Sequence, residues 1–371
     1  MIKLVFSSLF LISFCSACES RKIRVIDKES SFVELELIKE IKPFENESVK
    51  IGQASFSKID VDTDLYIIDW SSSNLKVFSK NGNLIRIIGR AGKGPNELSN
   101  PMYFCFKGDE IWISEFDTDA FKVFSKNGDF LRKVSVNRSI EIDTTKAKVK
   151  FGDNIMKMFL GEFVIDKNGL IWYPGIDNNT FIGKPVVVID GRNGNIVKTA
   201  GEYPKEFSGT DWGYSGSFVD VFSSKYVIGF SKSASFILSD ISHSNQEWIA
   251  TNKKSKPYIS DRRPKQYSGD IEFARRIAMS EISNSFYAMV NEDIVLREYG
   301  TITETSIKYK SEVQRENYLE LIDVKNNIFH TIKIKGRVCD FNNGLLLIEE
   351  SDEPDNRRFG LYEVKFITQN N

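Results

Sequence analysis

The amino-acid sequence predicts an all-β protein, a six-bladed β-propeller of four-stranded antiparallel blades. Residues 65–86 and 111–132 are closely similar in sequence and are offset by 46 residues. Each segment has short, alternating apolar stretches separated by polar turns, which is typical of a meander of antiparallel strands. Repeats of about 40 to 60 residues that consist of short strands are the signature of a propeller, in which each small sheet packs against its neighbours.

The number of blades follows from a large, mostly aromatic position that recurs along the chain. Its members are Tyr66, Trp112, Trp172, Tyr226, Tyr287 and Leu346. They are 46, 60, 54, 61 and 59 residues apart, so we expect six blades, each carrying this position on its second strand. Seven residues before each of these positions lies an apolar or small residue, as an inward position on the innermost strand requires.

The N-terminus predicts export and lipid anchoring. Residues 1–17 contain Lys3, an apolar run and small residues before Cys18, a pattern that resembles a bacterial lipoprotein signal peptide. The apolar run is too short for a permanent membrane-spanning helix, which needs about 20 residues. We therefore expect cleavage before Cys18, acylation of that cysteine, a charged tether over residues 18–30, and a single propeller over residues 31–371.

Ring closure is expected to involve the start of the propeller. Residues 32–38, FVELELI, alternate like a strand but have no place in blade one. Because an open ring would leave sheet edges exposed, we assign this segment as the outer strand of the last blade. Residues 268–279 are expected to form a short inserted helix, and the basic run 261–276 a solvated surface.

The composition excludes several classes of function. The 371 residues include 50 Lys+Arg and 51 Asp+Glu, so the formal net charge is −1 and no general attraction to nucleic acid is expected. The only two histidines, His243 and His330, cannot build a three-histidine zinc site and have no partner that indicates catalysis. Cys105 and Cys339 fall on blades two and six, too far apart to bridge, so both should be reduced core residues.

Two kinds of turn are expected within the blades. The pairs 81–82 and 127–128 are both Asn-Gly, which favours two-residue hairpins with a type I′ turn. Six residues before the recurring large position the chain carries Asp60, Phe106, Asp166, Asp220, Glu281 and Asp340. We expect these carboxylates to cap turns, and a ring of cation ligands is the alternative.

The connection from blade one to blade two carries a family resemblance. Residues 87–101 read IIGRAGKGPNELSNP, which looks like the interblade connection of NHL-type propellers. More narrowly, it resembles the Gly-Arg-x-Gly-x-Gly-Pro-x-Glu loop of bacterial six-bladed β-propeller lipoproteins. The matching residues are Gly89, Arg90, Gly92, Gly94, Pro95 and Glu97. The resemblance implies the fold over about residues 30–366 and does not imply a reaction. The glycines are expected to serve the crossover; a phosphate cradle with Lys93 is the alternative.

A ligand site is expected on the face that carries the interblade connections and the loops after each second strand. The candidate ligand-binding residues are Asp69, Trp70, Arg90, Lys93, Glu115, Phe116 and Asp177. Exposed aromatic rings beside carboxylates and amides suit a glycan or a peptide, whereas packing of the rings between blades is the structural alternative.

The expected function is that of a monomeric, lipid-anchored protein of the cell envelope that binds a glycan, peptide or partner protein without catalysis. The expected location is the outer membrane, on its periplasmic side or at the cell surface. No cofactor and no nucleic acid are expected. The alternative is a metal-dependent hydrolase or lyase of the NHL or lactonase-like group, in which channel carboxylates hold a divalent cation such as calcium.

Overall fold

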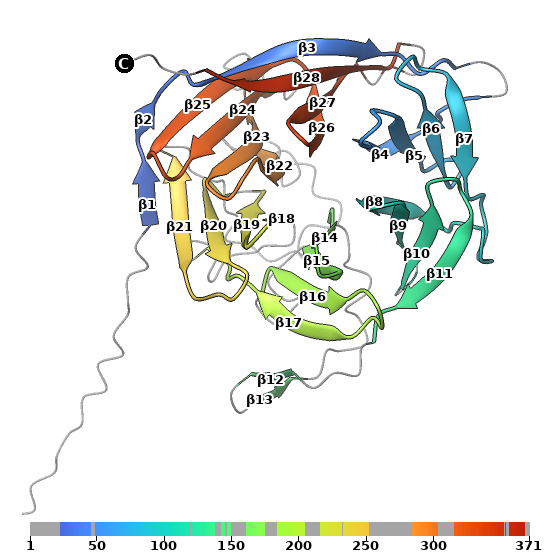
Figure 1. Cartoon of the computed structure of the whole chain (residues 1–371), viewed down its shortest axis with the longest axis horizontal. Coiled ribbons are helices and arrows are strands. Elements are labelled where there is room, and N and C mark those ends of the chain that lie inside the picture. Colours follow the sequence, from blue (N-terminus) through green and yellow to red (C-terminus); the bar gives the residue numbers. More distant parts are fainter. Residues whose placement is uncertain are drawn as a thin grey trace, which may run out of the picture.

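Six small sheets form a closed ring (Figure 1). The space that the innermost strands of a propeller surround is its central channel. The computed structural model describes residues 23–45, 49–116, 118, 120–137, 142–144, 147–149, 161–174, 184–204, 216–231, 233–251, 283–302, 315–351, 353 and 356–367. The predicted fold class, a six-bladed propeller of four-stranded antiparallel blades, is confirmed. Among the described residues, no helix has the length and apolar character that crossing a bilayer requires.

The strands of the first three blades run from the channel outward in chain order. Blade one contains β4 (Ala54–Ile59), β5 (Leu65–Asp69), β6 (Asn74–Phe78) and β7 (Leu84–Ile88). Blade two contains β8 (Pro101–Lys107), β9 (Glu110–Glu115), β10 (Ala120–Ser125) and β11 (Phe130–Ser135). A separate hairpin, β12 (Ile142–Thr144) and β13 (Ala147–Val149), comes before blade three. Blade three contains β14 (Val164–Ile165), β15 (Leu170–Pro174), β16 (Val186–Asp190) and β17 (Ile196–Ala200).

The last three blades receive additional strands from the N-terminal part of the chain. Blade four contains β18 (Ser217–Phe222), β19 (Lys225–Phe230), β20 (Ser235–Asp240) and β21 (Gln246–Thr251). Blade five contains β22 (Ser283–Met289), β23 (Ile294–Ile302), β24 (Arg315–Asp323) and β25 (Ile328–Ile334). Blade six contains β26 (Arg337–Asn342), β27 (Leu345–Ser351), β28 (Arg358–Phe366) and, as its outer strand, β3 (Val33–Ile41).

Strand β3 closes the ring, as predicted for residues 32–38. It pairs antiparallel with β28, from Val33 opposite Phe366 to Ile41 opposite Phe359. This pairing joins the two ends of the propeller domain and covers the edge that blade six would otherwise expose.

The predicted tether over residues 18–30 is wrong for its second half. Strand β1 (Ile23–Ile26) pairs in parallel with β21 of blade four, and β2 (Lys28–Glu29) pairs in parallel with β25 of blade five. Ile26 is fully buried among side chains of these two blades. Residues 23–29 show no apolar pattern in the sequence because Ile26 is their single deeply buried side chain. Their backbone pairs with strands that are distant in the chain. In Figure 1, β1, β2 and β3 follow one another around the outside of the ring.

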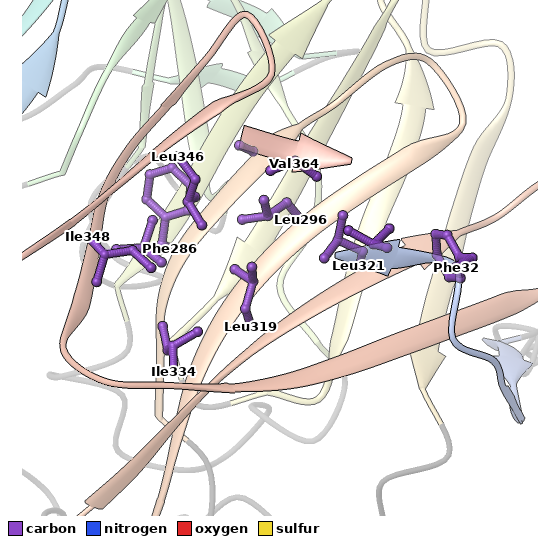
Figure 2. Packing of buried hydrophobic residues seen from close by; sticks show 12 residues of the cluster. Phe32, Phe286, Leu296, Leu319, Leu321, Ile334, Leu346, Ile348 and Val364 are labelled. Atoms are coloured by element: carbon purple, nitrogen blue, oxygen red, sulfur yellow. The ribbon is translucent and has the colours of Figure 1, made fainter. Parts of the chain in front are cut away.

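Each gap between neighbouring blades is filled by apolar side chains from both. Figure 2 shows one such cluster, at the junction of blades five and six. Its labelled side chains are Phe32, Phe286, Leu296, Leu319, Leu321, Ile334, Leu346, Ile348 and Val364. Phe32 precedes β3, so the chain segment that closes the ring also contributes to this interblade core.

Two local sequence-based predictions need correction. The Asn-Gly hairpins are not type I′ turns, because Gly82 and Gly128 have positive φ whereas the preceding asparagines do not. The amide of Ser79 donates to Asn83 O and the amide of Gly82 to Ser79 O, with a register shift at Phe78. This is the longer hairpin in which a glycine with positive φ forms a bulge.

The second correction concerns the register of blade five. Tyr287 lies on the innermost strand, β22, and not on the second strand, where the recurring position places it. The second residue of the second strand is Val295, which is paired with Met289 and is buried. The spacing of large residues therefore pointed to Tyr287 on the neighbouring strand instead of Val295. The number of blades is unaffected.

Several predictions fall outside the described residues. These are the signal peptide, Cys18, Asp177, Glu281, the helix at 268–279 and the basic run at 261–276.

Candidate functional site

A cavity of about 330 Å³ lies at one end of the central channel. Its lining comes from the innermost strands, or the residues just before them, of all six blades. The lining residues are Ser55, Phe56, Ser57, Tyr103, Gly161, Glu162, Gly216, Ser217, Phe218, Ser285, Phe286, Arg337, Val338 and Cys339. A larger cavity of about 530 Å³, shared by blades one, five and six, also includes Arg337. We take the first as the candidate site, because only there do all six blades converge.

Both hydroxyl groups and charged groups line this channel mouth. The Ser55 hydroxyl is buried and has no hydrogen-bond partner among the residues that the structure describes. The hydroxyls of Ser217 and Ser285 donate to Pro185 O at 2.9 Å and to Glu298 Oε2 at 2.8 Å. The Arg337 guanidinium is paired with Glu349 Oε2 at 2.6 Å, yet its side chain remains about half exposed.

Just inside the mouth, a lysine is held between two carboxylates of other blades. Lys58 Nζ pairs with Glu162, and with Asp340 Oδ1 at 3.1 Å. Burial disfavours the charged ammonium, but Asp340 and Glu162 outweigh this effect and raise the pKa of Lys58. Burial raises the pKa of Glu162. Within the described part of the chain, no three His, Cys, Asp or Glu residues are grouped closely enough to hold a metal ion.

Asp69 and Glu115, both predicted ligand contacts, are buried and bonded to the protein itself. Asp69 accepts hydrogen bonds from the amides of Gly52 and Gln53 and pairs with Lys76. These hydrogen bonds, together with those from two serines, hold the pKa of Asp69 far below its usual range despite burial. In its own blade, each of Asp69 and Glu115 fixes the connection before the innermost strand to the loop after the second strand. Neither carboxylate faces solvent.

Glu115 occupies the equivalent place in blade two. It accepts a hydrogen bond from the amide of Ser99 at 2.6 Å and lies 3.3 Å from Lys122 Nζ. It also lines a small cavity of about 230 Å³ that includes Lys93. The structure therefore brings Lys93 and Glu115 together, but away from the channel mouth.

Trp70 and Phe116 are partly exposed on equivalent loops of blades one and two. About 40% of each residue is open to solvent, so they do not simply pack between blades. Their amides donate to Gln53 O and Asn100 O, the residues just before the innermost strands of their own blades. These bonds hold the backbone of Trp70 and of Phe116 beside the start of an innermost strand, on the same face as the channel mouth.

The Gly-rich connection between blades one and two folds around its own glutamate. Glu97 accepts hydrogen bonds from the amide of Gly94 at 2.8 Å and from Arg90 Nη2 at 3.1 Å. A Cβ on Gly92, whose φ is +147°, would lie 2.2 Å from Glu97 Oε2, so the close approach requires glycine. The Glu97 carboxylate fills the space that a phosphate cradle would need, which supports the crossover interpretation. Most of the Arg90 side chain is exposed.

The carboxylates expected to cap turns divide into two groups. Asp60 Oδ1 accepts from the amides of Asp62 and Asp64, and Asp166 Oδ1 from those of Asn168 and Leu170, so the prediction is confirmed for these two.

For Asp220 and Asp340 the turn-capping prediction is wrong. Asp220 accepts from the amide of Met289 at 2.7 Å, and Asp340 from the amide of Ile59 at 3.1 Å. Each therefore connects its innermost strand to that of the next blade. In blade six, the pairing of β26 with β27 shifts register between Val338 and Asp340, at the same place where Asp340 differs in role from Asp60 and Asp166.

The two described cysteines are free, which confirms the predicted absence of a bridge between them. Cys339 is buried, whereas Cys105 is only partly buried. Burial raises the pKa of Cys105 to about 11 and that of Cys339 to about 12, so both are thiols at neutral pH.

Sequence reasoning missed the channel mouth. Ser55, Glu162 and Arg337 are separated by more than a hundred residues along the chain and share no motif. What these residues share is their place in the blade, because all three lie at or near the start of an innermost strand. A correct register for every blade would have placed them on one face.

The fold and the six-blade convergence at the channel define this molecule as a closed, single-ring β-propeller. The chain belongs to the family described as 6-bladed beta-propeller, whose model matches residues 30–336. None of the curated proteins compared with the chain matches its sequence.

Solved structures share the fold at low sequence identity. One is a member of the DUF4221 family from Bacteroides vulgatus, with 13% identity, a TM-score of 0.59, and coverage of 91% of this chain and 99% of the other. Another is a protein from Bacteroides fragilis described as a candidate exported protein, with 12% identity, a TM-score of 0.56, and coverage of 94% and 100%. At these identities the similarity shows the fold alone.

Proposed function

We propose that this protein is a lipid-anchored binding protein of the bacterial cell envelope that holds the end of a glycan or peptide in the channel mouth, without catalysis. The observation that carries the proposal is the unpartnered, buried hydroxyl of Ser55 within a cavity lined by all six blades. A buried polar group without a partner is costly, and a ligand that hydrogen-bonds to it recovers that cost.

The shape and chemistry of the mouth favour one polar unit of a longer chain. A volume of about 330 Å³ is at the lower end of the range of about 300–1,000 Å³ for small-ligand pockets. Serine hydroxyls, Glu162 and Arg337 offer donors and acceptors, and Phe56 and Phe218 add apolar surface. The remainder of the ligand would extend over the same face, where Trp70 and Phe116 are exposed.

The histidines support a binding role over a hydrolytic one. His243 is bonded to the Tyr226 hydroxyl at 2.7 Å, and His330 to the Ser31 hydroxyl at 3.3 Å. Neither lines the channel mouth. The ammonium of Lys58 already neutralises the nearby carboxylates, in the place where the alternative, a metal-dependent hydrolase or lyase, would need a divalent cation.

The proposal is tested by screening the full chain in detergent against glycan and peptide arrays and measuring the affinity of any hit by calorimetry. Ser55→Leu narrows the cavity and removes the hydroxyl, so affinity should fall at least tenfold. Ser242→Leu, at an exposed serine outside the cavity lining, is the matched control and should leave affinity within twofold. Equal affinity of both variants would contradict the proposed site. A calcium-dependent rise in melting temperature would instead favour the metal-dependent enzyme.

A further inference from the structure

The first described strand of the chain is held firmly on the outer rim of the ring. Strand β1 pairs with β21 over four residues, and Ile26 at its end is fully buried. The Arg24 guanidinium donates to Val324 O at 2.6 Å and to Asn327 Oδ1 at 3.3 Å, so it connects β1 to blade five. The path of the chain toward its N-terminus is therefore fixed at Ile23, on the rim of blade four.

Chain length then limits how far this rim can lie from a lipid on Cys18. Ile23 follows Cys18 by five positions in the chain, and an extended chain advances at most about 3.3–3.6 Å per residue. Ile23 therefore lies no more than about 18 Å from the lipidated residue. A tether of this length cannot let the whole ring rotate freely above a membrane.

We propose that the outer rim formed by β1, β2 and β3, over blades four to six, faces the lipid bilayer. In this orientation the ring axis lies along the membrane plane, and the channel mouth opens sideways into the aqueous phase. The inference rests on the lipid anchoring included in the proposed function, and it adds which surface of the propeller meets the membrane.

The side chains on the rim suit contact with a lipid surface to which the N-terminal anchor already holds the protein. Six large apolar side chains are exposed on or beside the three strands: Ile23, Val25, Leu37, Ile38, Phe366 and Ile367. The last two lie against Phe32, since Phe366 stacks on its ring and the Ile367 amide donates to its carbonyl. Residues 23–41 contain three basic and five acidic side chains, a net charge of −2. Attraction to anionic headgroups is therefore not what holds the rim at the membrane.

The test compares two matched single-cysteine labels on the lipidated full chain in phosphatidylcholine vesicles. Val25→Cys lies on the proposed membrane rim and Ile87→Cys on the outer strand of blade one, across the ring; the native residues are 51% and 47% exposed. Each is labelled with bimane, and unmutated chain corrects for reaction of Cys105 and Cys339. Nitroxide on the lipid headgroups should quench the label at position 25 at least threefold more strongly. Inserting 20 Gly/Ser residues after Glu19 should abolish the difference.

Equal quenching of the two labels in the chain without the insertion would overturn the orientation. Mass spectrometry of the N-terminal peptide separates this failure from failure of the proposed function. If Cys18 carries no acyl chain, the anchoring and this inference both fail. If Cys18 is acylated and quenching is equal, only the orientation fails.

Discussion

At the scale of single residues, the charged side chains near the channel connect blades. Asp220 is a clear case, because its partly buried carboxylate accepts a hydrogen bond from the Met289 amide across the boundary between blades four and five. Burial raises the pKa of the Asp220 carboxyl to about 6, although two backbone amides and Lys58 act in the opposite direction. The side chain therefore connects two blades while carrying a charge that the interior disfavours.

This pKa predicts how stability depends on pH. An unfolded aspartate has a pKa of about 3.9, so between about pH 4 and 6 the folded state binds more protons. The free energy of unfolding should therefore fall as pH rises through this window. Asp220→Asn keeps an acceptor for the Met289 amide without the charge, so it should flatten this part of the profile and stabilise the protein at pH 8 by up to about 3 kcal/mol.

The measurement is the urea midpoint from pH 4 to pH 8 for both proteins. Glu292→Gln, at a partly exposed glutamate on a turn, is the control and should retain the wild-type slope between pH 5 and 6. An unchanged slope in Asp220→Asn would contradict the assignment of the proton to this carboxyl.

At the scale of elements, the N-terminal strands act together as a strap over three blades. For β3 the strand could be predicted from the sequence, because apolar and polar residues alternate from Val33 to Leu37. Strands β1 and β2 are only four and two residues long, and parallel pairing with a blade edge leaves no periodic signal. This explains why the sequence predicted the ring closure correctly and the tether boundary incorrectly.

The contribution of the strap can be measured at two adjacent positions. Ile26→Ala removes a fully buried side chain from the cluster between blades four and five, and should lower the free energy of unfolding by about 2–5 kcal/mol. Val25→Ala, one residue earlier and about half exposed, should change it by less than about 0.5 kcal/mol. Chemical denaturation of both variants is the test, and a change of less than about 0.5 kcal/mol for both would show that the burial of Ile26 does not stabilise the fold.

At the scale of the whole molecule, the antiparallel pairing of β3 with β28 joins the start of the propeller to its last blade. Glu34 and Lys365 are a cross-strand pair in this contact and both are exposed. Residues directly opposite in an antiparallel pair have Cα atoms about 4.5–5.5 Å apart, within the range that a disulfide can span.

A covalent bond at this point should therefore stabilise the closed ring. The double variant Glu34→Cys/Lys365→Cys should form a disulfide and gain about 2–4 kcal/mol, because the bond closes a loop of nearly the whole chain. The reduced form of the same variant is the control. The melting temperatures of both forms are measured by thermal unfolding. If oxidised and reduced forms melt at the same temperature, closure by β3 does not limit stability.

The sequence by itself determined the blade number, the order of the strands, the closing strand and the capping role of Asp60 and Asp166. These features arise from local patterns, namely alternating apolar residues, turn residues and a repeat, which act within a few residues of the chain. Only the tertiary structure decided the convergence of Ser55, Glu162 and Arg337, the place of Lys58 between two carboxylates, and the packing of residues 23–29. These features join residues of different blades, and a small error of register on any blade moves its side chains to other neighbours without leaving a trace in the local pattern.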